Sequence, residues 1–217
     1  MLATATDPTV LTPRWRGLLH TWWFVLAIPS GALLILSSEQ AEARAAASIY
    51  AATLLLVFGT SASYHRLARS PRARHVMQRL DHSMIYLLIA GTYTPICLVA
   101  LPHSWGIPIL ATVGACAIVG IALKLTAFDR GQVLSFALYP IMGWALIAAL
   151  PVLADHLSVG QLALIVVGGV AYTIGFPILL VKRPNPWPRT FGYHEIWHLF
   201  TVHAGTLHFA AVASVVV

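Results

Sequence analysis

Two histidines four residues apart, His194 and His198, occur in the string His-Glu-Ile-Trp-His near the end of the chain. Four residues turn an α-helix through about 400°, so both imidazoles would lie on one face and could reach a single metal ion. The string also matches the H-E-x-x-H pattern of zinc proteases, in which Glu195 would be the general base. The spacing therefore predicts a pair of metal ligands, and histidine-rich ligation favours zinc.

Further candidate groups occur at the ends of two other apolar segments. Ser61 and His65 are four residues apart, and Asp81 stands at the predicted start of the third segment. A third imidazole would complete a zinc site that keeps one position open for water, and zinc lowers the pKa of that water toward about 7. We predict His65, His194 and His198 as zinc ligands and Asp81 as the group that takes the proton of the zinc-bound water. Ser61 would supply a hydrogen bond to a ligand or to the transition state.

Each of these residues also has a purely structural interpretation. Asp81 could cap the third helix, where a carboxylate interacts favourably with the helix dipole. Ser61 could hydrogen-bond to its own helix backbone, and His65 alone could be an interfacial histidine. The pair of histidines on one helix face is harder to explain in this way, because ionisable groups inside a bilayer are costly without a partner.

The composition of the chain predicts an integral membrane protein. Of its 217 residues, 59% are hydrophobic and 9% are charged, whereas soluble domains carry about 25% charged residues. Apolar runs of about 20 residues are long enough to cross a bilayer. Seven such spans cover roughly residues 17–38, 46–67, 82–101, 106–126, 133–153, 159–181 and 194–216. The sequence therefore predicts an all-α bundle of seven transmembrane helices over residues 14–217, after a flexible leader at residues 1–13.

Basic residues are distributed unevenly between the two sides of these predicted spans. All the arginines and lysines except Arg44 fall on the N-terminal side. By the positive-inside rule, the N-terminus is then cytoplasmic and the C-terminus is outside. The net charge of +6 is thus explained by topology, so we expect no nucleic-acid partner and expect a membrane lipid as substrate or ligand. This orientation places His65, Asp81 and His194 near the cytoplasmic side.

Three strings resemble the hemolysin III family, the bacterial branch related to the progestin and adipoQ receptors. They are SASYHRL at 61–67, LDHSMIYLLIAGTYTP at 80–95 and FGYHEIWHLFTVHAGTLHF at 191–209. With the seven spans, the resemblance covers the chain after residue 14. The wider superfamily includes adiponectin receptors and alkaline ceramidases. Its shared pattern is Ser-x-x-x-His in the second span, Asp at the third and His-x-x-x-His in the seventh. The matching residues here are Ser61, His65, Asp81, His194 and His198.

This resemblance implies a seven-helix bundle that holds zinc within the membrane through His65, His194 and His198, with Asp81 near the zinc-bound water. It implies a zinc-dependent hydrolase acting on a membrane lipid amide or ester, as ceramidases do, in a bacterial plasma (inner) membrane. The receptors carry an additional cytoplasmic N-terminal domain that does not precede the first span here, which argues against receptor signalling.

Two other functions stay open from the sequence. One is a non-enzymatic receptor, lipid-homeostasis or hemolysin-type protein with a structural zinc, in which Asp81 would be the fourth ligand. The other is an intramembrane metalloprotease with Glu195 as general base. The protease hypothesis leaves His65 and Asp81 without a necessary role.

Overall fold

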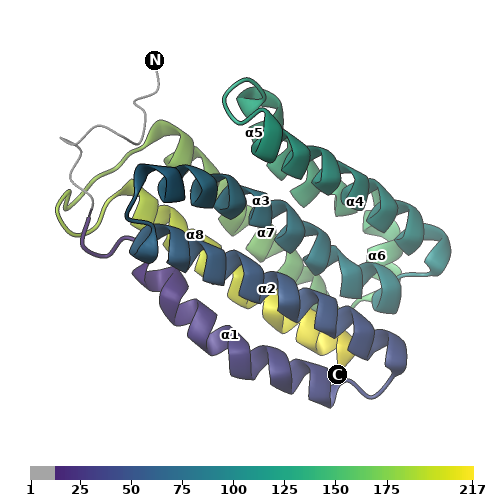
Figure 1. Ribbon diagram of the computed structural model, residues 1–217. Helices are drawn as coiled ribbons and strands as arrows, with labels where there is room; N and C mark the ends of the chain where they lie inside the picture. The colour runs from purple at the N-terminus through teal and green to yellow at the C-terminus, as the bar shows by residue number, and fades with distance from the viewer. Residues whose placement is uncertain (1–12) are drawn as a thin grey trace.

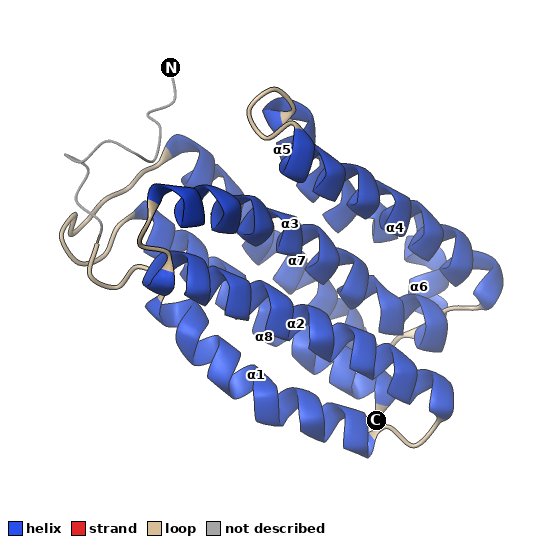
Figure 2. Ribbon diagram, in the orientation of Figure 1, coloured by secondary structure: helices blue, strands red, loops and turns tan. Residues whose placement is uncertain are grey.

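The computed structural model describes residues 13–217, and its long elements are all helices (Figures 1 and 2). The elements are α1 (Leu18–Ser37), α2 (Ala41–Leu67), α3 (Pro71–Pro95), the π-helix η1 (Ile96–Ala100), α4 (His103–Thr126), α5 (Gln132–Gly143), the 3₁₀-helix η2 (Ala145–Ala149), α6 (Leu150–His156), α7 (Val159–Val181) and α8 (Tyr193–Val216). They form seven apolar segments long enough to cross a membrane, the fifth combining α5, η2 and α6. The predicted all-α, seven-span architecture is therefore confirmed, while the orientation of its termini stays a prediction. The predicted leader, residues 1–13, lies outside the described residues except for Pro13.

Helix α3 begins well before its apolar segment, at Pro71 rather than near residue 82. The Ser70 side chain accepts a hydrogen bond of 3.1 Å from the backbone N–H of Ala73, and a proline in the first turn suits a helix start. The first turns of α3 are polar, so hydropathy marked the start of the apolar segment instead of the start of the helix. Asp81 is consequently inside α3, and the expectation that it stands at the helix start, where it could act as an N-cap, is wrong.

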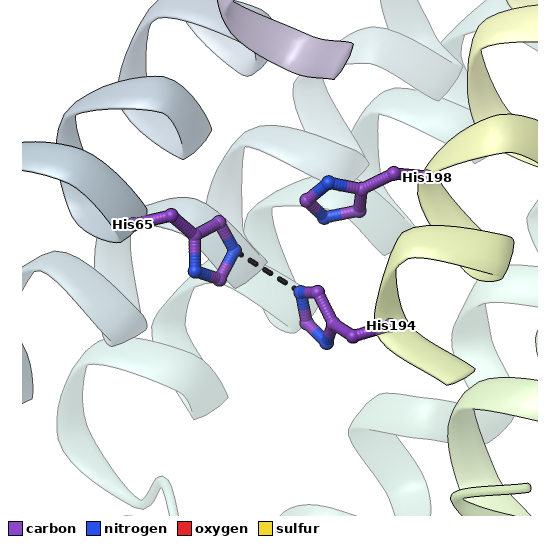
Figure 3. A group of neighbouring side chains, drawn as sticks. All are labelled: His65, His194 and His198. Carbon is purple, nitrogen blue, oxygen red and sulfur yellow. Dashed lines mark hydrogen bonds between the residues drawn. The ribbon is translucent and has the colours of Figure 1, made fainter. Parts of the chain in front are cut away.

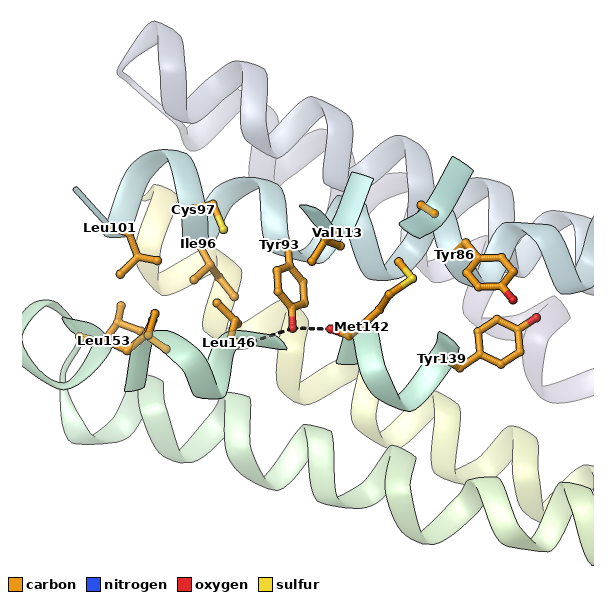
Figure 4. Close-up of a cluster of buried hydrophobic side chains, with 13 residues drawn as sticks. Tyr86, Tyr93, Ile96, Cys97, Leu101, Val113, Tyr139, Met142, Leu146 and Leu153 are labelled. Carbon is orange, nitrogen blue, oxygen red and sulfur yellow. Dashed lines mark hydrogen bonds between the residues drawn. The ribbon is translucent and has the colours of Figure 1, made fainter. Parts of the chain in front are cut away.

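Helix α8 packs against four other helices of the bundle. It contacts α1, α2, α3 and α7, and in Figure 1 its yellow ribbon runs behind α2 and α3. One cluster of buried apolar side chains joins α1, α2, α3 and α8, and a second joins α3 and α4 to the fifth span. Figure 4 shows this second cluster extending along α3 from Tyr86 and Tyr139 to Leu101 and Leu153.

Glycines allow the neighbouring helices to pack closely. A Cβ atom added to Gly91 of α3 would overlap the side chain of Thr53 in α2, and one added to Gly120 of α4 would overlap the ring of Tyr86 in α3. Small residues at helix contacts are a common means of association within membranes. These two contacts fix α2, α3 and α4 in register, and so fix the polar side chains near their ends.

Candidate metal centre

Three imidazoles from two helices meet at one end of the bundle (Figure 3). His65 lies in the last turn of α2, whereas His194 and His198 lie on the first turns of α8. The Nε2 atoms of His65 and His194 are 3.1 Å apart, and one nitrogen from each of the three rings lies within 4.8 Å of the others. We call these residues the histidine cluster, and this end of the molecule the histidine end.

The donor set of the histidine cluster fits a zinc ion, and so does the spacing of its closest pair of nitrogen atoms. Zinc binds imidazole nitrogens at about 2.0–2.1 Å in tetrahedral geometry, which places two ligand atoms about 3.3 Å apart. The 3.1 Å separation between His65 and His194 is close to that value. Three neutral nitrogen ligands are also the number that leaves one position open for water. Occupancy by zinc stays a prediction that this geometry supports.

A fourth histidine, His20 of α1, packs against the cluster, although no role was predicted for it from the sequence. Its ring is buried and stacks on the ring of His198, with centroids 3.6 Å apart and planes at 9°. Its Nδ1 lies 2.8 Å from the hydroxyl of Ser61, and its Nε2 lies 3.0 Å from the hydroxyl of Thr201. The sequence feature that could have identified His20 is its position along the span. His20 stands in the first turn of α1, and α1 begins at the histidine end.

The hydrogen bonds around His20 indicate which of its two ring nitrogens carries the proton. Thr201 donates its only hydroxyl proton to the carbonyl oxygen of His198 at 2.9 Å, so it accepts from Nε2–H of His20. In neutral His20 the other nitrogen, Nδ1, is then an acceptor, and it faces the hydroxyl of Ser61. Ser61 thereby fixes the orientation of His20, which in turn packs against the predicted ligand His198.

The segment before α1 crosses directly over His65. Gly17 has φ of +77°, a left-handed conformation that glycine adopts without strain, and a Cβ at this position would lie 2.5 Å from the Cβ of His65. The backbone N–H of Arg14 donates to the carbonyl of Arg189 at 3.0 Å. The chain before α1 is therefore tied to the loop before α8 and covers one side of the cluster.

Glu195, at the centre of the His-Glu-Ile-Trp-His string, has both carboxylate oxygens occupied. Its side chain is 1% exposed, and its Oε1 accepts a hydrogen bond of 2.6 Å from Nε of Arg16. Its Oε2 accepts from the backbone N–H of Gly192 at 2.8 Å, which holds the first turn of α8. These contacts give Glu195 a structural role and lend no support to the hypothesis that it is a protease general base.

Asp81 is half-buried in α3 and lies beside Ser61 of α2. Ser61 is itself buried, stands one turn before His65 on the same helix and contacts His20. The structure thus brings Asp81 and Ser61 to the histidine end, together with the three imidazoles. The Asp81 carboxylate is not among the atoms that lie within 4.8 Å of one another in the histidine cluster, which suits a proton acceptor near a bound ion.

Comparison with known proteins gives consistent matches over most of the chain. The family model described as Haemolysin-III related matches residues 9–209. "Hemolysin-3" of Bacillus cereus is 33% identical over 200 residues, covering 91% of this chain and 88% of that protein. The "Hemolysin-3 homolog" of Bacillus subtilis (strain 168) is 29% identical, covering 91% of each chain. The human "Monocyte to macrophage differentiation factor" is 26% identical over 203 residues, covering 89% of this chain and 79% of that protein.

Proposed function

We propose a zinc-dependent lipid hydrolase function for this chain, which belongs to the Haemolysin-III related family and is a multi-pass membrane protein. The substrate would be a membrane lipid amide or ester, as for a ceramidase. The observation that carries the proposal is the meeting of three imidazoles and one carboxylate at one end of the bundle. A zinc ion held by His65, His194 and His198 would lower the pKa of a water molecule and polarise the substrate carbonyl.

Asp81 carries the proton in this proposal. Its carboxylate takes the proton released when water adds to the carbonyl carbon, and returns it to the departing amine or alcohol. It lies beside Ser61, which stands one turn before His65 on α2, so it is close to the cluster. Glu195 is the other acidic residue near the cluster, and its contacts with Arg16 and Gly192 leave it no free oxygen for the same task.

Ser61 and His20 act on the metal ligands rather than on the substrate. The hydroxyl of Ser61 orients His20, and the face of His20 restricts rotation of the His198 ring. Groups that orient metal ligands typically change metal affinity or activity by about 10–100-fold when they are removed. Ser61 is therefore a positioning residue in the proposed reaction.

We further propose that the histidine end faces the cytoplasm of a bacterial plasma membrane. The relatives from Bacillus cereus and Bacillus subtilis support a bacterial setting. All the arginines except Arg44 lie in the helix ends and connecting segments at the histidine end, whereas Arg44 lies near the opposite end of α2. The positive-inside rule then assigns the histidine end to the cytoplasmic side.

The proposed activity can be tested by release of free fatty acid from defined lipids by the purified protein in detergent. We expect release from a ceramide or from an ester-linked lipid. Treatment with a zinc chelator should lower the rate by at least about a hundredfold, because the zinc-activated water is lost. Adding zinc should restore the rate, and adding magnesium should not, because magnesium prefers oxygen ligands. Release that survives complete removal of metal would contradict the proposal, and retained zinc without hydrolysis of any lipid would favour a structural site.

A further inference from the structure

Three nitrogen atoms with no hydrogen-bond partner lie together beside α3 and the end of α4. Within residues 13–217 these buried atoms are Nε of Arg79, Nδ1 of His82 and Nζ of Lys124. All three side chains contact the ring of Phe128, which follows α4. The Arg79 guanidinium carbon lies 5.9 Å and the Lys124 Nζ 5.2 Å from its centroid, and the His82 ring stacks on it at 5.4 Å. Phe128 thus covers a small group of cationic and hydrogen-bonding nitrogens.

Lys124 is the strongest indication that this group receives a ligand. Its side chain is 0% exposed, and neither of the ion pairs found between described residues includes it. Its ammonium lies 4.0 Å from the centroid of Phe136 and 5.7 Å from that of Tyr139. Aromatic faces attract a cation, but they do not replace the oxygen acceptors that its three N–H groups have in water. A buried ammonium without an anionic partner is costly, so this group of nitrogens lacks an acceptor.

We propose that Arg79, His82 and Lys124 bind the carboxylate or phosphate headgroup of a single-chain membrane lipid. Such an oxyanion would supply acceptors to all three nitrogens and would be charge-compensated by Arg79 and Lys124. The binding requires neither zinc nor hydrolysis, so it is separate from the proposed reaction.

The surroundings of Lys124 favour a lipid over a free anion. Lys124 adjoins the apolar cluster in Figure 4 at Tyr139, whose ring stacks on Tyr86 with centroids 4.5 Å apart. Farther along α3, Tyr93 and Leu146 line an apolar cavity of about 70 Å³. Tyr86 and Tyr93 are seven residues apart, which is about 10 Å along the helix. A headgroup at Lys124 would therefore meet apolar side chains along α3, surroundings that suit an alkyl chain better than a hydrated free anion.

Binding of matched amphiphiles to the purified full chain in detergent tests this proposal. The probes are oleate, oleyl phosphate and the neutral oleyl alcohol, counted as bound molecules by native mass spectrometry. We expect one of the two anions to bind at least about tenfold more tightly than the alcohol, because only an oxyanion pairs with Lys124. Lys124→Met should remove that preference. Lys182→Met makes the same chemical change outside the proposed binding site and should keep that preference.

The binding measurements can contradict the proposal directly. Equal binding of the three amphiphiles, or a preference that survives Lys124→Met, would overturn the proposal. Displacement of bound oleate by millimolar inorganic phosphate would assign the proposed binding site to a free anion and overturn the lipid source. Thermal unfolding of the ligand-free proteins gives a second measurement. We expect Lys124→Met to unfold at the same or a higher temperature than the wild type, because it removes an uncompensated charge. A markedly lower unfolding temperature would show that Lys124 only stabilises the fold through its aromatic contacts.

Discussion

Replacing His198 by alanine is expected to reduce zinc from about one ion per chain to less than about a tenth of that amount, because a three-ligand site loses its most buried ligand. His198 is buried beneath the ring of His20, whereas His65 and His194 are half-buried. Neither His20 nor Ser61 can replace it, since both are engaged with each other. The measurement is elemental analysis of protein purified in detergent and dialysed against a weak competing chelator.

His203→Ala provides the matched control for this loss. His203 is on the same helix but is exposed and lies on the opposite face from His194. We expect this variant to keep the wild-type zinc content and to unfold at a similar temperature. Equal zinc contents in His198→Ala and His203→Ala would show that the histidine cluster does not bind the metal.

Asp81→Asn is expected to retain zinc but to lower the rate of lipid hydrolysis by about 10²–10⁴-fold, the usual contribution of a positioned acid–base group. The amide has nearly the same shape as the carboxylate, so α3 should keep its packing against α2. What is lost is the ability to take a proton from the attacking water. The measurement compares kcat for fatty-acid release with the zinc content of the same preparation.

Glu195→Gln separates this mechanism from the protease alternative. Glu195 forms a buried ion pair with Arg16 and caps α8, so we expect its replacement to destabilise the protein. Breaking a buried ion pair on one side typically costs about 3–5 kcal/mol. Folded Glu195→Gln protein should still hydrolyse lipid at a rate within about tenfold of the wild type, because the proposed acid–base contribution comes from Asp81. If Glu195→Gln is catalytically inactive while Asp81→Asn is active, the roles assigned to the two carboxylates are reversed.

The features that could be predicted from the sequence depend on local periodicity. Seven apolar runs predict seven spans, and the spacing of His194 and His198 places both rings on one helix face whatever surrounds them. His65 reaches the same point only through tertiary packing, which the sequence does not show. Its position at the end of a span nevertheless predicts that it lies at one end of the bundle. The resemblance to a known family gave the same three residues.

The features that the sequence did not show depend on where one segment packs against another. Hydropathy shows where the apolar segment begins and not where the helix begins. The predicted start of the third span was therefore near Asp81, although α3 begins at Pro71. The roles of His20 and Glu195 arise because the segment before α1 folds over the start of α8. Lys124 resembles any basic residue at the end of a span, and only the rings packed around it show that it is buried.

The central claim is that the histidine cluster holds a catalytic zinc with an open position. X-ray absorption at the zinc edge, on purified wild-type protein and on Asp81→Asn, tests it most directly. We predict one zinc per chain, three imidazole nitrogens at about 2.0–2.1 Å and one oxygen, with the same coordination in both proteins. A protein without zinc would contradict the account, and so would the loss of an oxygen ligand in Asp81→Asn, because Asp81 would then be the fourth ligand of a closed, structural site.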